Sequence, residues 1–404
     1  MDASSSSLTP QRERLLLIVL ALVQFAHVVD FMIIMPLGPR LMLDFGISPG
    51  RFGALVSAYT FSAGICGFLA APLLDRFKRK SALLFSFSGF ILATTLCGFS
   101  SSYEWLLCMR IVAGCFGGMS SSLIFATVAD AVPLERRGAA MGIVMTSFAL
   151  ASVLGVPMGI FAANHLGWRA PFLILGGLSL FLLALAAQAL PHVQRAPRAV
   201  KESLAASLKA VFGVPQHWLA FGFTSTLMFS GFVIIPYISP TLVQNVGIRN
   251  EQLPYIYMTG GLCTFFTMPL IGRLADRFGL FRMFLIMAIL SLPFMFIVTH
   301  LGRITLWQTL PLTTLFMICA SGRITPAMTL VTAAVEPRHR GGFLSVNNAF
   351  QQIAMGLAAM TAAMTLKQSP NGNLLHYGIA GWIGIVVLIL SALLASRIRK
   401  VRQA

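Results

Sequence analysis

Two short stretches about two hundred residues apart decide the fold of this chain. They read APLLDRFKRK at residues 71–80 and GRLADRFGLFR at residues 272–282, and both contain Asp-Arg-Phe, at an offset of 201. Three more matches keep the order and nearly the same offset: Ile-x-Pro at 34–36 and 234–236, tryptophan at 105 and 307, and Arg-Gly at 137–138 and 340–341. Ordered matches at a slowly drifting offset predict two homologous halves.

The sequence around these stretches is strongly apolar. Of its 404 residues, 57% are hydrophobic and only 10% are charged, whereas soluble proteins carry about 25% charged residues. Apolar runs of about 20 residues, each long enough to cross a ~30 Å hydrocarbon core, recur along the chain. Because backbone groups inside hydrocarbon have no water partner, these runs are expected to be helices. The predicted fold class is an all-α integral membrane protein with twelve transmembrane helices in two pseudo-symmetric six-helix bundles.

The apolar runs and their flanking charges place the predicted spans. They cover residues 15–39, 51–74, 81–100, 105–129, 138–163, 169–190, 216–244, 252–275, 281–300, 306–333, 342–366 and 375–396. The resulting regions are a cytoplasmic tail (1–14), an N-terminal six-helix bundle (15–190), a cytoplasmic linker (191–215), a C-terminal six-helix bundle (216–396) and a second tail (397–404). The linker is basic and weakly amphipathic, which favours a helix on the membrane surface over a regulatory segment.

The basic residues predict the orientation. With the N-terminus inside, 21 lysines and arginines fall in inner loops and tails, 6 at outer ends and two inside helices. This asymmetry follows the positive-inside rule, so both termini are expected in the cytoplasm and the chain in the cell inner membrane. The net charge of +17 has the same origin, because the charges occupy short gaps between apolar runs. Nucleic acid is therefore not an expected partner.

Parallel six-helix halves are typical of transporters, with the solute site near the midplane where the halves meet. The expected partners are a small-molecule solute, protons and the lipid bilayer, and the expected state is a monomer. None of the six cysteines forms a Cys-x-x-Cys pair, so neither disulfides nor a metal site are expected. The sequence has no Walker loop, His-Glu-x-x-His or Gly-x-Ser-x-Gly motif, which argues against an enzyme and predicts no cofactor.

The two opening stretches resemble the Gly-x-Leu-x-Asp-Arg-x-Gly-Arg-Arg loop of the major facilitator superfamily. The first has Ala71 and Lys78 in place of glycines, whereas the second keeps both glycines. In that family the loop latches helix ends across the two halves, which implies conformational gating by Asp75, Arg76, Arg79, Asp276 and Arg277. Residues 155–159, Gly-Val-Pro-Met-Gly, resemble bacterial drug- and sugar-efflux proton antiporters and add Gly155, Pro157 and Gly159 to the gating residues.

Asp30 is the acid that the spans place well inside a helix. A carboxylate in the membrane interior is costly and marks an ion or solute path. Burial and a nearby cation act in opposite directions on its protonation, so such a group can load and release protons near neutral pH. We predict proton coupling at Asp30 rather than a fixed ion pair. The resemblance agrees, since efflux members often carry a proton-binding acid in the first helix.

Gln24 and His27 precede Asp30 at intervals of three residues, so the three side chains share one helix face. His27 is either a proton relay or solute contact, or a histidine hydrogen-bonded to a neighbouring helix. Arg110, which resembles the family's buried arginine, lies at a depth similar to that of Asp30 and is its predicted partner. Arg323 has no mate in the repeat, which favours solute contact over a scaffold role.

Other candidates line the predicted cavity. Asn348, Gln351 and Gln352 share one face of the eleventh span, as solute ligands or as interhelical hydrogen-bonding groups. Tyr59 and Tyr237 are further candidate solute contacts. The three buried charges leave about +1 when Asp30 is ionised and about +2 when it is protonated. This charge favours an anionic, zwitterionic or polar neutral solute over a lipophilic cation.

The sequence thus predicts a proton-coupled secondary active transporter that exports a small polar, anionic or zwitterionic solute or drug by alternating access. Three alternatives stay open. The first is a proton-coupled importer or facilitator of the same fold, the second a lipid or lysolipid transporter, and the third a membrane receptor that transports nothing.

Overall fold

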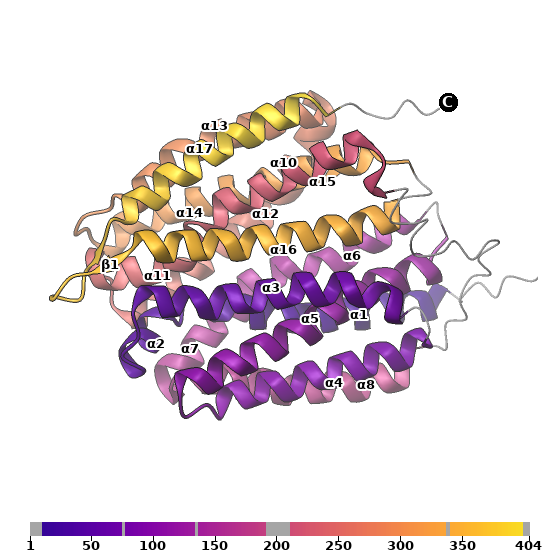
Figure 1. The fold of residues 1–404 in the computed structure, drawn as a ribbon, viewed down its shortest axis with the longest axis horizontal. Helices are drawn as coiled ribbons and strands as arrows, with labels where there is room; N and C mark the ends of the chain where they lie inside the picture. The colour runs from indigo at the N-terminus through magenta and orange to yellow at the C-terminus, as the bar shows by residue number, and fades with distance from the viewer. Residues whose placement is uncertain (1–9, 75–76, 134–135, 191–210, 337–339, 399–404) are drawn as a thin grey trace, which may run out of the picture.

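The computed structural model of the chain describes residues 10–74, 77–133, 136–190, 211–336 and 340–398. Each of the twelve predicted spans falls on a helix or on consecutive helices of these residues (Figure 1). The described residues leave out Asp75 and Arg76, most of the predicted linker and the outer parts of both tails.

The first half of the chain contains eight α-helices and one π-helix in the described residues. They are α1 (Pro10–Ile33), α2 (Gly38–Asp44), α3 (Pro49–Leu74), α4 (Arg79–Gly98), α5 (Tyr103–Ala131), α6 (Arg137–Leu150), the π-helix η1 (Ala151–Gly155), α7 (Val156–Leu166) and α8 (Ala170–Ala189).

The second half repeats this arrangement and adds a short β-hairpin. Its helices are α10 (Pro215–Phe232), η2 (Ile235–Tyr237), α11 (Ile238–Thr241), η3 (Leu242–Val246), η4 (Asn250–Gln252), α12 (Leu253–Phe278), α13 (Leu280–Thr299), α14 (Leu306–Gly322), α15 (Ile324–Ala333), α16 (Arg340–Thr365) and α17 (Tyr377–Ser396). The strands β1 (Lys367–Gln368) and β2 (Leu374–Leu375) pair antiparallel, with Lys367 opposite Leu375.

Several predicted spans are broken helices. The first, predicted over 15–39, ends as a helix at Ile33, and a turn leads into α2. The seventh, predicted over 216–244, ends as an α-helix at Phe232 and continues in short turns. Both breaks fall at the repeated Ile-x-Pro, because proline lacks the N–H that an uninterrupted helix needs. The repeat therefore places a break at the same point of each half.

Ten helices of the described residues are long and apolar enough to cross a membrane. The two long helices outside this set are α12 and α16. Four amide side chains lower the hydropathy of α16, at positions 347, 348, 351 and 352. These two helices also make the contacts between the halves of the chain, so the less apolar helices lie at the centre of the molecule.

The helices pack as two groups. Within residues 10–189, α3 and α4 pack on α5, and α1 packs on α6 and α8; within 215–396, α12 packs on α14, and α10 on α16 and α17. These groups are called the N-terminal and C-terminal bundles below. They meet where α3 runs beside α16, and where α12 packs on η1 and α7 (Figure 1).

The bundles are joined at the end of the molecule that carries α2 and the hairpin, here called the α2 end. The Tyr237 hydroxyl donates to the Pro49 carbonyl oxygen at 2.8 Å. The Asn164 amide donates to the Asn250 carbonyl oxygen at 3.0 Å. Gly53 permits this approach, because a Cβ there would lie 2.5 Å from the Cβ of Ala363 on α16. In the predicted topology the α2 end is the outer end, so the structure is closed on that side.

Candidate functional site

Asp30 on α1 and Arg110 on α5 form an ion pair in the interior of the N-terminal bundle. Arg110 Nη1 lies 2.9 Å from Asp30 Oδ2, and both side chains are 0% exposed. The same nitrogen donates to the Asp30 carbonyl oxygen at 3.2 Å, and the Thr94 hydroxyl donates to Asp30 Oδ1 at 3.2 Å. The predicted pairing of Asp30 with Arg110 is confirmed.

Glycines on α5 position this pair. A Cβ on Gly114 or Gly118 would collide with the backbone of Tyr59 or Ala63 on α3, so only glycine lets the two helices approach so closely. The approach brings the Tyr59 ring under Arg110, whose Cζ lies 4.3 Å from the ring centroid. This cation–π contact stabilises a buried guanidinium. Nε and Nη2 of Arg110 have no hydrogen-bond partner among the described residues.

The polar stripe of α1 faces the N-terminal bundle. The Gln24 side-chain oxygen accepts a hydrogen bond from the Ser121 hydroxyl of α5 at 3.2 Å. The His27 ring lies against Phe87 and Phe90 of α4, with centroid distances of 5.5 and 4.1 Å. In the described part of the chain neither His27 nitrogen has a hydrogen-bond partner. Of the two alternatives for His27, a hydrogen bond to a neighbouring helix is not found among these residues, and a role as proton relay or solute contact stays open.

An aromatic stack connects the ion pair to the C-terminal bundle. Phe31, next to Asp30, stacks on Tyr59 with a centroid distance of 5.6 Å and on Phe232 of α10 with 5.7 Å. Phe31 and Phe232 remain partly exposed although they lie between the bundles. Their rings therefore border solvent-accessible space at the junction, one residue from the ion pair.

Arg323 is the buried cation of the C-terminal bundle. It occupies the break between α14 and α15 and is 2% exposed. Pro326 explains this break, because proline has no N–H for the helical hydrogen bond and its ring collides with the carbonyl four residues earlier in a regular helix. Nη1 donates to the Ser291 hydroxyl at 3.3 Å and lies 3.7 Å from Met295 Sδ, both on α13. No carboxylate of the described residues lies within 4.0 Å of this guanidinium.

The amides of α16 lie near the junction of the bundles. Asn348, Gln351 and Gln352 are partly exposed, and Gln351 Nε2 lies 3.8 Å from Met328 Sδ. A Cβ on Gly64 of α3 would lie 3.1 Å from the Cβ of Gln352, which places Gln352 at the contact between bundles. Its side-chain oxygen has no partner within the described ranges. These three amides therefore stay candidates for solute contact.

The other predicted residues lie away from this region. Tyr237 is at the α2 end, where its hydroxyl binds Pro49. Gly155 and Gly159 lie against α1, since a Cβ on either would collide with Val29 or Ile33, and Pro157 lies in the first turn of α7. Arg79 pairs with Asp130 of the same bundle at 2.8 Å, while Asp276 and Arg277 are exposed at the end of α12. The remaining gating candidates, Asp75 and Arg76, lie outside the described residues.

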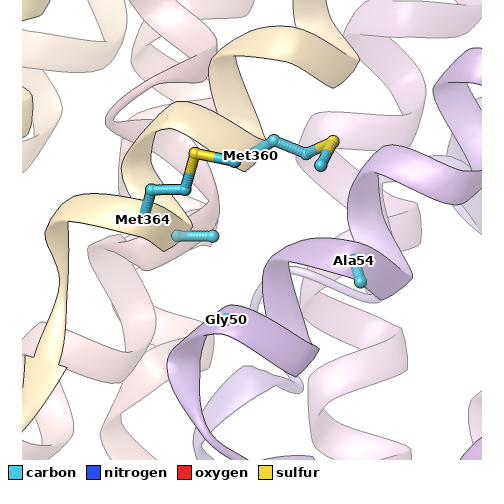
Figure 2. A pocket seen from close by; sticks show the side chains of 5 residues that line it. Gly50, Ala54, Met360 and Met364 are labelled. Carbon is cyan, nitrogen blue, oxygen red and sulfur yellow. The ribbon is translucent and has the colours of Figure 1, made fainter.

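A recess of about 280 Å³ lies between α3 and α16 near the α2 end (Figure 2). Gly50, Ala54, Met360, Ala363 and Met364 line it. Apart from the weakly accepting sulfurs of Met360 and Met364, this lining offers no side-chain hydrogen-bonding group and no charge for a polar solute. The charged and aromatic groups at the junction, and not this recess, form the candidate site.

The hydroxyl groups that complete the site escaped the sequence analysis. Thr94 and Ser291 bind Asp30 and Arg323, and Thr224 donates to the buried Asn347 at 2.6 Å. Hydroxyls inside apolar runs commonly bond to their own helix backbone, as Ser291 does to Ala288 and Thr224 to Ala220. The sequence carries no signal that shows which of these hydroxyls also reaches a side chain on another helix.

Two joined helical bundles with buried charges at their junction define a class of multi-pass membrane transporters. The sequence pattern of the Major Facilitator Superfamily matches residues 20–359 and again residues 223–404, and the chain belongs to this family. Members of the family are transporters of small molecules and not enzymes.

Known proteins resemble the whole chain or part of it. The uncharacterized MFS-type transporter YceJ of Bacillus subtilis is 26% identical over 94% of this chain and 95% of its own. A gallate transporter of Pseudomonas putida is 32% identical over 44% of this chain and 40% of its own. A bacterial homologue of the human lysosomal transporter Spinster, solved in an inward-facing and occupied conformation, superimposes with a TM-score of 0.76 at 17% identity, covering 97% of this chain and 98% of its own.

Proposed function

We propose that the chain is a proton-coupled antiporter that exports a small polar, anionic or zwitterionic solute by alternating access. The observation that carries this proposal is the fully buried pair of Asp30 and Arg110 beside the junction of the bundles. A buried ion pair usually gains no stability over an apolar pair of the same volume. Ionisable groups kept at such a position mark a proton or solute path.

Protonation of Asp30 changes what Arg110 can bind. With Asp30 ionised, the pair is neutral, and Nη1 of Arg110 is held by the carboxylate and the backbone carbonyl. With Asp30 protonated, the guanidinium keeps its charge and loses its counterion. For the proton and the solute to move in opposite directions they must bind alternately, so the protonated and ionised states of Asp30 must differ in their affinity for the solute.

The stack of Tyr59, Phe31 and Phe232 supports a path from this charge change to the other bundle. Phe31 follows Asp30 directly on α1, and its ring contacts Phe232 of α10. A shift of α1 on protonation would move the ring at the junction. Rocking of the bundles would then separate the α2 end, where Tyr237 and Asn164 hold them together.

The relatives support the solute class. One is named as a gallate transporter, and gallate carries a carboxylate that suits an arginine without a counterion. Another, a chloramphenicol resistance protein of Streptomyces lividans, is 24% identical over 59% of this chain and 61% of its own. Its name supports drug export as the direction of transport.

The regions predicted from the sequence belong to the same proposal. We propose bundles over 15–190 and 216–396, a linker over 191–215, both tails in the cytoplasm, and a monomer in the cell inner membrane. The positive-inside asymmetry supports this orientation.

The test uses purified protein in liposomes with an imposed pH gradient. A panel of labelled solutes, gallate and chloramphenicol among them, is offered to wild type, Asp30→Asn and Asp44→Asn. The last variant is the matched control, because Asp44 is exposed on α2 and pairs only with Arg40 one turn away. We expect Asp30→Asn to lose gradient-driven transport while the control keeps it. Full gradient-driven transport by Asp30→Asn would show that Asp30 is not the proton site.

A further inference from the structure

The charges of the candidate site are unequally matched. Arg110 has Asp30 at 2.9 Å, whereas Arg323 contacts only a serine hydroxyl and a methionine sulfur in the described residues. Nε of Arg323 has no partner at all in that part of the chain. A buried charge without a counterion is costly, and a hydroxyl and a thioether replace little of its lost hydration. The site therefore has one positive charge to be matched by a ligand.

The guanidinium of Arg323 packs against the backbone of α10. A Cβ on Gly231 would lie 3.2 Å from Nη2 of Arg323, so only a residue without a side chain lets the guanidinium lie this close to α10. The next residue is Phe232, whose ring joins the stack with Phe31 and remains partly exposed. A planar cation and a solvent-accessible aromatic surface are therefore contributed by one short stretch of α10 and the break after α14.

We propose that Arg323 binds the carboxylate of an aromatic monocarboxylate, whose ring lies against Phe31 and Phe232. This inference rests on the proposed function, and it narrows the solute class at the same site. The guanidinium fork matches a carboxylate with two parallel hydrogen bonds. Aromatic rings gain further from edge and offset contacts with other rings.

The charges of Asp30, Arg110 and Arg323 favour a solute with one carboxylate over a solute with two. Arg110 is already neutralised by Asp30, so a second carboxylate near it would face the Asp30 charge. A neutral solute would leave Arg323 unmatched, and a cation would add to its charge. The bound carboxylate has to displace Ser291 and Met295, which hold Nη1 at 3.3 and 3.7 Å. Both are uncharged acceptors, whereas a carboxylate brings the opposite charge and accepts two parallel hydrogen bonds from the guanidinium.

Binding to purified protein tests the proposal. The probes are benzoate, cinnamate and 1-naphthoate, each beside its neutral amide, and acetate as a carboxylate without a ring. Calorimetric titrations use wild type, Arg323→Gln, Arg323→Lys and Phe232→Leu. The matched controls are Arg303→Gln and Phe266→Leu, because Arg303 lies between α13 and α14, Phe266 lies on α12, and both are exposed. Thermal unfolding of each variant verifies that it is folded.

We expect at least one aromatic acid to bind wild type, with its amide and acetate weaker by tenfold or more. Arg323→Gln should weaken the acid by at least about 30-fold, which corresponds to the lower bound for truncating one partner of a buried charged pair. Arg323→Lys should recover only part of that loss, because lysine lacks the planar fork. Phe232→Leu should weaken the aromatic acids by about three- to tenfold and leave acetate unchanged.

Two results would overturn the inference. One is equal affinity of an acid for wild type and for folded Arg323→Gln. The other is absence of binding by every aromatic acid in the panel. The failure of the proposed function is a separate outcome: aromatic acids would bind in an Arg323-dependent way, yet no pH gradient would drive their transport. If proton-driven transport of chloramphenicol depends on Asp30 while no acid binds, the proposed function stands and this inference falls.

Discussion

Replacing Tyr237 by phenylalanine removes the hydroxyl that joins the two bundles at the α2 end. The side chain is 0% exposed and its hydroxyl donates to the Pro49 carbonyl oxygen at 2.8 Å. The phenylalanine ring keeps the shape and removes one hydrogen bond, while the Pro49 carbonyl, in the first turn of α3, keeps its bond within the helix. The net contribution of such a hydrogen bond is about 0.5–1.5 kcal/mol. The bond from Tyr237 joins the bundles only while they are in contact, so the loss falls on the closed state alone.

The equilibrium between the closed and open states should therefore shift toward the open state by about 2- to 12-fold. Electron–electron distance measurements between spin labels at positions 43 and 307 report this shift. Both positions lie at the α2 end, one in each bundle, and Leu43 and Trp307 are 81% and 80% exposed, so labels are tolerated there. The labelled protein has its six native cysteines replaced by alanine.

Wild type should show mainly the short distance, and Tyr237→Phe should gain a population at a longer one. Tyr255→Phe is the matched control, since Tyr255 lies in the first turn of α12 and is 54% exposed. Identical distance distributions in wild type and Tyr237→Phe would refute the assignment of this hydrogen bond as a closing contact.

The remaining predictions concern the N-terminal bundle. Gly118→Ala should destabilise the protein by about 1–3 kcal/mol, because the new Cβ meets the Ala63 backbone. Gly177→Ala is the control in thermal unfolding, because nothing lies within 4 Å of a Cβ there. Equal losses of stability in the two variants would contradict the packing argument. Arg110→Lys should lower solute transport at least about tenfold in a folded protein, since lysine keeps the charge but loses the planar contact with Tyr59. An unchanged transport rate in that variant would show that charge alone suffices.

The sequence predicted the arrangement of the helices better than their ends. The repeated Ile-x-Pro coincides with the breaks that the structure has in the first and seventh spans, because proline acts on the local backbone whatever surrounds it. The predicted spans nevertheless ran past Ile33 and Phe232, since the residues that follow are as apolar as those before. Hydropathy measures burial in hydrocarbon and is insensitive to a turn made of apolar residues.

The sequence predicted how deep in the membrane the site residues lie, and it did not predict which neighbouring helices their side chains face. Counting residues from the interface placed Asp30 and Arg110 at one level, and they pair. Helical periodicity also placed Gln24 and His27 on the face of Asp30, but it cannot say which helix that face meets, and the stripe faces α4 and α5. Phe232 and Thr94 were missed for the same reason, because their contacts depend on how distant helices pack.

The most direct measurement of the central claim is the number of protons exchanged when a solute binds. Calorimetric titration of one bound solute in two buffers of different ionisation enthalpy gives this number at equilibrium. Wild type and Asp44→Asn should exchange protons with the buffer, because the solute and the proton on Asp30 alter each other's affinity. Asp30→Asn should bind the solute with no proton exchanged. The same proton count in Asp30→Asn as in wild type would contradict the account.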